Sequence, residues 1–306
     1  MYSLDHMVAE DGKKVYVHKW IPDGKSKGIL LISHGISEHG GRYGHFSDFL
    51  NAKGYAVYSQ DHRAHGLTAG DNLGTDGTQD TFLEIVKDMR LLNHKARNEH
   101  ENLKVVQFGH SMGSFLSIRY AEAFPETIDA LILSGNNGPG GRGSIMAGVA
   151  ISQALISSKG RDSRGDIINN MMFGKFGGKI KDKRTEFDWI SRDSEQVDKY
   201  VEDPFCGIVM SNGFYGSMLS NLLKLYSKEE LSRIHKDLPI LIASGTEDPV
   251  GNMGNGPIAL AKLLEKTTGS RKLFVRLYKG ARHEILNETN RVEVYGDILK
   301  FVDMHI

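Results

Sequence analysis

The chain has 306 residues, and 38 lysines and arginines balance 38 aspartates and glutamates, so its formal net charge is zero. A balanced chain without a basic run has little electrostatic attraction to nucleic acid, so nucleic-acid binding is not expected. Its apolar runs are shorter than the 18 residues that a membrane-spanning helix needs, so at most peripheral membrane contact is expected. The length suits one α/β core of about 230 to 250 residues with an insertion.

The single cysteine, Cys206, cannot form an internal disulfide bond, and the first residues lack the basic segment and apolar stretch of a secretory signal. These features predict a cytoplasmic protein. Cys206 shows no sign of activation, so a small buried thiol is its expected role. Nothing in the sequence indicates the oligomeric state.

Strands and helices alternate through the first 135 residues. Alternating or continuous apolar runs predict strands at residues 14–20, 28–33, 55–60, 103–108 and 128–134. Apolar residues at helical spacing predict helices around residues 46–50, 82–92 and 115–121. This alternation is typical of a mostly parallel sheet with helices on both faces.

The pattern changes at the turn-rich segment 136–143, after which about a hundred residues show helical periodicity but no buried strand. We interpret residues 136–235 as a helical cap inserted into a core formed by residues 1–135 and 236–306. Two apolar residues of the cap, Phe173 and Met218, are candidates for lining a substrate pocket. The strand pattern resumes at 238–245 and 272–278, and a final helix closes the chain.

The segment Gly109-His110-Ser111-Met112-Gly113 fits the pattern GxSxG, and it lies between a predicted buried strand and a predicted helix. At such a turn a serine is held in a strained backbone conformation with its hydroxyl exposed at the end of the sheet. The two glycines leave room for the close approach of strand and helix. The motif therefore predicts Ser111 as a nucleophile.

A serine hydroxyl needs a base that takes its proton and an acidic residue that orients the base. Asp248 and His283 each follow a predicted strand, so both are expected at the carboxyl edge of the sheet beside the serine. The order serine, acid, histidine is that of the α/β-hydrolase fold. Glu247, Asp203 and Asp237 are alternative acids.

The negative oxygen of a tetrahedral intermediate requires preorganised donors. The backbone amide of Met112, at the start of a helix, and that of Ile36, in the loop after the strand at 28–33, are the predicted pair. Other polar residues are expected to hold this architecture rather than to react: Glu38, His39, Arg42 and the loop 61–66.

These motifs together resemble the monoacylglycerol lipase and lysophospholipase branch of the α/β-hydrolases. The segments that carry the resemblance are His34-Gly35-Ile36-Ser37-Glu38-His39 with Arg42-Tyr43, Asp61-His62-Arg63-Ala64-His65-Gly66, Gly109-His110-Ser111-Met112-Gly113, Gly245-Thr246-Glu247-Asp248-Pro249-Val250 and His283-Glu284. The resemblance implies a triad of Ser111, Asp248 and His283, and a helical lid over an acyl-chain pocket. It also implies the amides of Ile36 and Met112 as the oxyanion hole. The chain departs from the family at Ala64, where glycine is usual.

The sequence thus predicts a serine hydrolase that needs no cofactor or metal and cleaves small-molecule carboxylic esters or lipids through an acyl-enzyme. Monoacylglycerols and lysophospholipids are the leading substrates. One alternative is a peptide hydrolase like the serine aminopeptidases, which would hold a substrate ammonium with carboxylates of the cap. The acidic residues available for this are Asp193, Glu195, Asp198 and Glu202. Another alternative is a non-catalytic binding protein on the same scaffold.

Overall fold

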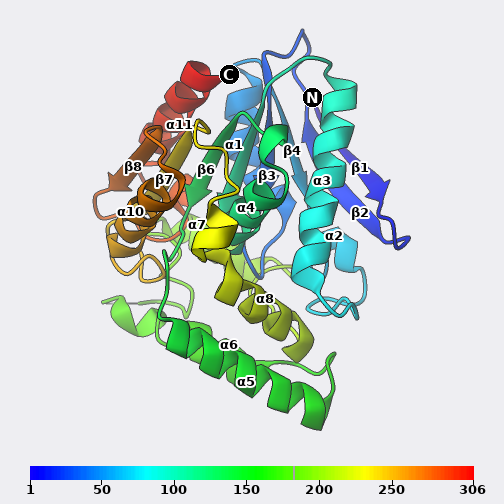
Figure 1. Cartoon of the computed structure of the whole chain (residues 1–306), viewed down its shortest axis with the longest axis vertical. Helices are drawn as coiled ribbons and strands as arrows, with labels where there is room; N and C mark the ends of the chain where they lie inside the picture. The colour runs from blue at the N-terminus through cyan, green and yellow to red at the C-terminus, as the bar shows by residue number, and fades with distance from the viewer. Residues whose placement is uncertain (182) are drawn as a thin grey trace.

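The computed structural model describes residues 1–181 and 183–306, in which eight strands form one sheet (Figure 1). Their bounds are β1 (Tyr2–Val8), β2 (Lys14–Trp20), β3 (Gly28–Ser33), β4 (Tyr55–Gln60), β5 (Val105–His110), β6 (Ala130–Ser134), β7 (Ile240–Gly245) and β8 (Leu273–Tyr278). The spatial order is β1-β2-β4-β3-β5-β6-β7-β8. Strand β2 pairs antiparallel with β1 and β4, and all other neighbours pair in parallel. The predicted mostly parallel sheet is confirmed.

Strand β1 was not predicted. It pairs along its whole length with β2, but it lies at the edge of the sheet and most of its side chains are exposed. An edge strand of this kind needs no continuous apolar run. By contrast, every residue of β3, β4, β5, β6 and β7 is buried, which explains the apolar runs that predicted them.

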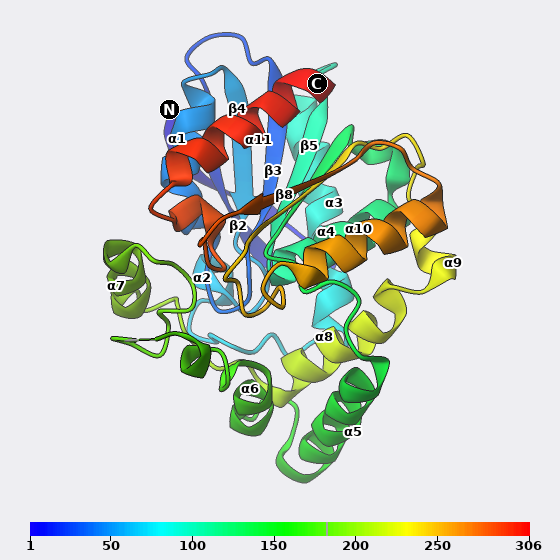
Figure 2. The same cartoon turned by 90° about the vertical axis from the view of Figure 1, so that its left-hand side faces the viewer.

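Helices cover both faces of the sheet (Figure 2). Successive residues of β3 enter opposite layers: Leu31 belongs to one apolar cluster and Leu30 to the other. The first cluster includes residues of α3 (Thr81–Glu99), α4 (Met112–Ala123) and α10 (Asn255–Thr268), and the second those of α1 (Gly44–Asn51) and α11 (Arg291–His305). Short helical turns complete the core: η1 (Gly40–Tyr43), α2 (Gly66–Ala69), η2 (Pro125–Thr127) and η4 (Ile285–Asn287).

The segment between β6 and β7 is helical and lies at one end of the sheet (Figures 1 and 2). It contains α5 (Arg142–Lys159), α6 (Asp166–Phe173), η3 (Gly177–Lys179), α7 (Ser194–Glu202), α8 (Asn212–Leu225) and α9 (Lys228–Leu231). Its one bridge between extended residues, in the part of the chain that the structure describes, joins Arg164 to Ser211. The predicted cap at 136–235 falls within this segment, although the two-part division itself stays a prediction.

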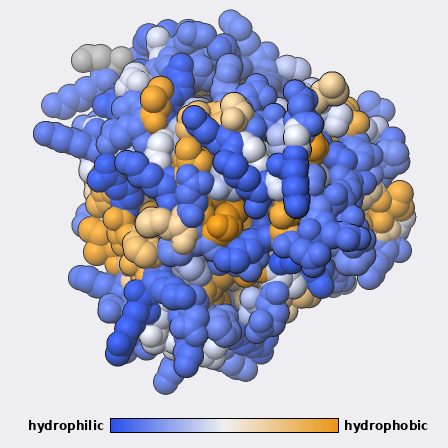
Figure 3. Space-filling model, turned by 90° about the horizontal axis from the view of Figure 1, so that it is seen from above, coloured by the Kyte–Doolittle hydropathy of each residue, from blue (hydrophilic) through white to orange (hydrophobic). Residues whose placement is uncertain are grey.

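Across the described ranges, none of the helices has both the length and the apolar composition needed to cross a bilayer. Figure 3 views the end of the molecule away from α5, where hydrophobic groups are scattered among hydrophilic ones. Single exposed apolar residues of this kind are normal on a folded protein.

Candidate active site

The turn between β5 and α4 has the geometry that the motif predicted. Ser111 has a φ of 50° and a ψ of −118°, a conformation that costs free energy for a residue with a side chain. A side chain at Gly109 would overlap the carbonyl oxygen of Gly113, and one at Gly113 would overlap that of Ser33. The Ser111 side chain is partly exposed, and its amide donates to the Ser134 carbonyl at 2.8 Å. The strained serine is thus fixed at the carboxyl edge of the sheet.

His283 and Asp248 are hydrogen-bonded to each other. The distance from His283 Nδ1 to Asp248 Oδ2 is 3.0 Å, and Asp248 is fully buried. The other carboxylate oxygen, Oδ1, accepts from the Val250 amide at 2.8 Å, so the acid itself is oriented. Glu247, the neighbouring alternative acid, is exposed. Of these two carboxylates, Asp248 therefore orients the histidine.

The charges around His283 favour its protonated form. Burial lowers the pKa of its imidazole, but the charge of Asp248, their hydrogen bond and the nearby Glu284 and Glu38 outweigh burial and raise it above 6.5. Burial also raises the pKa of Asp248, yet His283 and the backbone donors lower it overall. A histidine in this setting is well suited to accept a proton and to carry the charge.

Ser111 is not hydrogen-bonded to this pair, but its neighbour His110 packs on His283. Within the described ranges no hydrogen bond joins Ser111 Oγ to His283 Nε2. The ring of His110, the residue before Ser111, lies 4.7 Å from that of His283 between centroids. A methyl group placed on Gly35 would lie 3.2 Å from Ser111 Cβ and 3.3 Å from His110 Cδ2. Catalytic hydrogen bonds are often long without substrate, so this arrangement is compatible with a triad.

The backbone amides of Ile36 and Met112 have no acceptor among the residues that the structure describes. Met112 is the first residue of α4, where the helix dipole favours a negative group. The loop that carries Ile36 is anchored on both sides, because the Gly35 amide donates to Glu38 Oε1 at 2.5 Å and Ser37 Oγ donates to the Ile208 carbonyl at 2.7 Å. The role of the two amides as an oxyanion hole stays a prediction.

A buried ion-pair network connects the Ile36 loop to the His283 loop. Arg42 Nη1 donates to Glu38 Oε2 at 2.6 Å, and its two terminal nitrogens each donate to Glu284 at 2.8 Å. Burial opposes ionisation of Glu284, but Arg42 lowers the pKa of that carboxyl to about 2. The sequence predicted a structural role for Glu38 and Arg42, whereas Glu284 was noticed only as the neighbour of His283.

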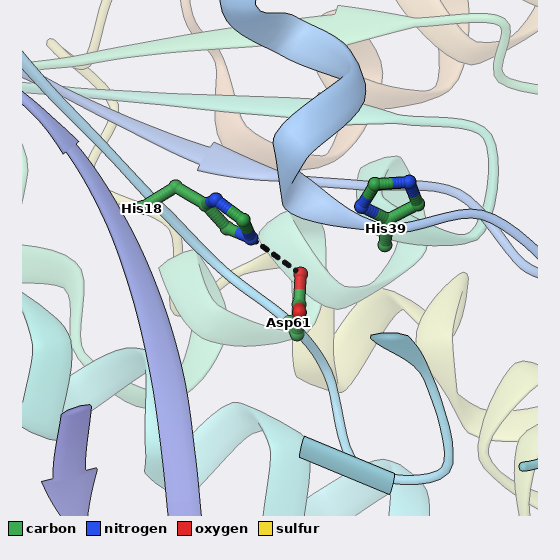
Figure 4. A group of neighbouring side chains, drawn as sticks. All are labelled: His18, His39 and Asp61. Atoms are coloured by element: carbon green, nitrogen blue, oxygen red, sulfur yellow. Dashed lines mark hydrogen bonds and ion pairs between the residues drawn. The ribbon is translucent and has the colours of Figure 1, made fainter. Parts of the chain in front are cut away.

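Two groups of described residues have the donor types of a metal site, and within each the ligand atoms lie within 4.8 Å of one another. One consists of His18, His39 and Asp61 (Figure 4), and the other of His39, Asp203 and Cys206. The nitrogen and oxygen ligand atoms are already engaged. His18 Nε2 bonds to Asp61 Oδ1 at 3.1 Å, an oxygen that also accepts from the Gly40 amide at 2.8 Å. His39 Nε2 bonds to Asp203 Oδ2 at 2.9 Å. These bonds hold loops together, and a metal ion would have to break them.

A cavity of about 220 Å³ lies beside the Ile36 loop. Its lining mixes aromatic and aliphatic side chains with polar ones: Ile36, Ser37, Asn169, Asn170, Phe173, Gly174, Glu186, Phe187, Trp189, Tyr200, Gly207 and Ile208. Phe173 thus lines a cavity, and its contact with a substrate stays a prediction. Met218 does not line this cavity, because it is only 2% exposed and packs in the main apolar cluster. Sequence reasoning also missed Trp189, whose ring lies 5.2 Å from that of His283.

Comparisons with known proteins agree with this geometry. A family model described as "Serine aminopeptidase, S33" matches residues 24–290. A monoacylglycerol lipase of Mycolicibacterium smegmatis is 27% identical over 295 residues, covering 96% of this chain and 95% of that protein. A monoglyceride lipase of Rattus norvegicus is 25% identical, covering 95% and 86%. A thermostable carboxyl esterase from Bacillus coagulans, solved with glycerol, superposes with a TM-score of 0.91 at 28% identity, covering 99% and 98%.

Proposed function

Because the chain belongs to the family described as serine aminopeptidase S33, whose model matches most of its length, we propose that it hydrolyses carboxylic esters through a serine acyl-enzyme. The predicted α/β-hydrolase fold of the monoacylglycerol lipase type is confirmed by the sheet, the family match and the relatives. The observation that carries the proposed reaction is the buried hydrogen bond between Asp248 and His283 beside a strained, partly exposed Ser111.

In this proposal Ser111 Oγ attacks the ester carbonyl carbon while His283 Nε2 takes its proton, and Asp248 stabilises the imidazolium. The carbonyl oxygen becomes an oxyanion and accepts from the amides of Ile36 and Met112. When the intermediate collapses, the carbon–oxygen bond to the alcohol breaks and His283 returns the proton to that alcohol. Water then attacks the acyl-enzyme by the same route and releases the acid and free Ser111.

Ester substrates fit the chain better than peptides do. An aminopeptidase would need free carboxylates in the cap to hold an ammonium group. Asp193 pairs with Arg291 at 2.7 Å and Asp198 with Arg184 at 2.8 Å, whereas Glu195 and Glu202 are exposed. Two relatives that match nearly the whole chain are a monoacylglycerol lipase and a monoglyceride lipase, so aminopeptidase is here only a label of the family.

We propose monoacylglycerols or lysophospholipids as the substrate class, with the segment 136–235 as a lid. The aromatic and aliphatic side chains in the cavity beside Ile36 support this, because they offer an acyl chain apolar contacts, while the polar groups of the same cavity could face a head group. Each buried methylene contributes about 0.8 kcal/mol, so four added carbons can raise kcat/KM by around two orders of magnitude. The cytoplasmic location stays a prediction.

The test is a substrate series from acetyl to decanoyl esters, run beside aminoacyl amides, with Ser111→Ala as the control for background hydrolysis. We expect kcat/KM to climb with chain length until the cavity is filled, and amide hydrolysis to be negligible. A flat series would contradict the lipid substrate, and amides that outrun decanoyl esters would contradict ester hydrolysis.

A further inference from the structure

One piece of the cap, Asp188–Asp193, is attached to the loop that carries the catalytic base. We call these two parts the docked segment and the histidine loop (Arg282–Arg291). Hydrogen bonds join them: Glu284 N to Ile190 O (2.7 Å), Arg282 Nη1 to Asp188 O (2.6 Å) and to Ser191 O (2.9 Å), and Ser191 Oγ to Asn287 O (2.8 Å). Because several of these bonds use backbone atoms, they fix the course of the chain rather than one side chain.

A buried carboxylate strengthens the attachment. Glu288 is fully buried, and its Oε1 accepts from the Arg282 amide at 2.7 Å within the histidine loop. Its two oxygens also accept hydrogen bonds from the docked segment: Oε1 from the Arg192 amide at 3.1 Å and Oε2 from Arg192 Nε at 2.8 Å. Hydrogen bonds to a buried charge are the strong ones. The docked segment and the histidine loop therefore behave as one structural unit.

This attachment places Trp189 against His283. The ring centroids are 5.2 Å apart, and the planes are inclined by 43°. On its cap side Trp189 packs on Phe176 at 5.2 Å, and Phe176 packs on Phe173 at 6.1 Å. A row of aromatic rings thus leads from the cavity to the imidazole. An indole within about 6 Å of a cation attracts it through the negative face of the ring.

We infer that Trp189 is a positioning residue of the hydrolysis: the docked segment holds its indole against His283, so that it fixes the imidazole and stabilises the imidazolium that forms when Ser111 is deprotonated. The inference rests on the proposed function and goes beyond it. It assigns to the cap a part in supporting the catalytic base, in addition to covering the substrate.

The other groups around His283 define the background against which Trp189 acts. Asp248, Glu284 and Glu38 favour the imidazolium. Burial lowers the pKa of His110 to about 3, and the positive charge of Arg42 acts in the same direction. His110 is therefore neutral at the pH of the assay. None of these groups belongs to the docked segment. A change at Trp189 therefore tests the indole without removing a charge.

The variant is Trp189→Leu, because leucine keeps apolar cover over the imidazole but has no aromatic face. Alanine would admit water, which favours the imidazolium and would obscure the result. We expect kcat to fall roughly three- to tenfold and the acid limb of the pH–rate profile to move down by about half a pH unit. Trp189→Phe keeps an aromatic ring and should recover most of both.

The matched control is Phe187→Leu, which removes an aromatic ring from the same cavity. Phe187 packs on Tyr200 at 5.0 Å, so this variant should change KM and leave the acid limb in place. An unchanged limb and kcat in folded Trp189→Leu would overturn the inference, as would an equal shift in Phe187→Leu. Activity retained in Ser111→Ala would instead overturn the proposed function.

Fluorescence gives a readout that does not depend on turnover. The chain has two tryptophans, so in Trp20→Phe the emission comes from Trp189 alone. A protonated imidazole quenches a neighbouring indole, so the emission should fall with acid at the midpoint of the acid limb, and this step should vanish when His283→Asn is added. A step that survives His283→Asn, or no step at all, would show that Trp189 does not sense His283.

Discussion

The ion pair between Arg42 and its two glutamates offers a quantitative test of how the site is held. We expect Arg42→Met to lower the free energy of unfolding by about 3 to 5 kcal/mol at pH 7, the usual cost of removing one partner from a buried ion pair. The arginine side chain is 11% exposed and makes three charge-assisted hydrogen bonds of 2.6 to 2.8 Å. Methionine leaves Glu38 and Glu284 buried near each other without a cation.

The stability deficit of Arg42→Met, which is its loss of unfolding free energy relative to wild type, should depend on pH because the ionisation of these carboxylates does. In the wild type the pKa of Glu284 is about 2, which is lower than that of a glutamate in the unfolded chain. Its ionised form therefore contributes fully to stability above the unfolded-state pKa, and this contribution is lost as the pH falls toward 2. In Arg42→Met the pKa of Glu284 should rise above that of an unfolded-state glutamate, because burial favours its protonated form once the arginine is gone. The variant therefore gains protons and regains stability as the pH falls from 7 to 5, so its deficit narrows.

Urea denaturation of wild type and variant at pH 7 and pH 5 measures both effects. The control is Arg164→Met, which removes an arginine that is 68% exposed from its pair with Asp166 and should cost less than about 1 kcal/mol. A loss below about 1 kcal/mol in Arg42→Met, or a deficit that widens toward pH 5, would refute the reasoning.

Four further changes test other parts of the account. Ester turnover should fall by five to six orders of magnitude in Ser111→Ala and by about four in Asp248→Asn, with unchanged far-ultraviolet circular dichroism. In wild type, kcat/KM should rise with pH through a midpoint above 6.5, because the raised pKa of His283 must be passed before it can accept a proton; a midpoint near 5 would be wrong. Ala64→Gly should stabilise the protein by about 0.5 to 1 kcal/mol in urea, since Ala64 has a φ of 67°. Glu288→Gln should lower the thermal midpoint and cost about 2 to 3 kcal/mol, since it weakens bonds from four donors.

Local sequence pattern was sufficient to predict those parts of the candidate site that depend on a single turn or on the end of a single strand. The glycines around Ser111 predicted the close approach of strand and helix, and the positions of Asp248 and His283 after two strands predicted their meeting at one edge. Strand β1 was missed because an exposed edge strand needs no continuous apolar pattern. The backbone at Ala64 is left-handed, with a φ of 67°, which is a conformation that favours glycine; nothing in the structure explains the alanine.

Contacts between distant segments could not be predicted from pattern. Trp189 reaches His283 across 94 positions of the chain, through a segment whose attachment depends on backbone hydrogen bonds. The helical spacing of Met218 places it on an apolar helix face, but such a face can line a pocket or pack on the core. In the structure Met218 packs in the first apolar cluster. We therefore expect Met218→Asp to destabilise the protein rather than to alter chain-length preference.

The central claim is that Ser111 is acylated, and active-site labelling tests it most directly. Wild-type protein treated with a fluorophosphonate should carry one adduct, which peptide mass spectrometry should locate on Ser111, and ester hydrolysis should be lost in proportion to labelling. Ser111→Ala should carry no adduct and show no turnover above background. An adduct on another residue that accounts for the lost activity, or undiminished hydrolysis by the fully labelled protein, would contradict the account.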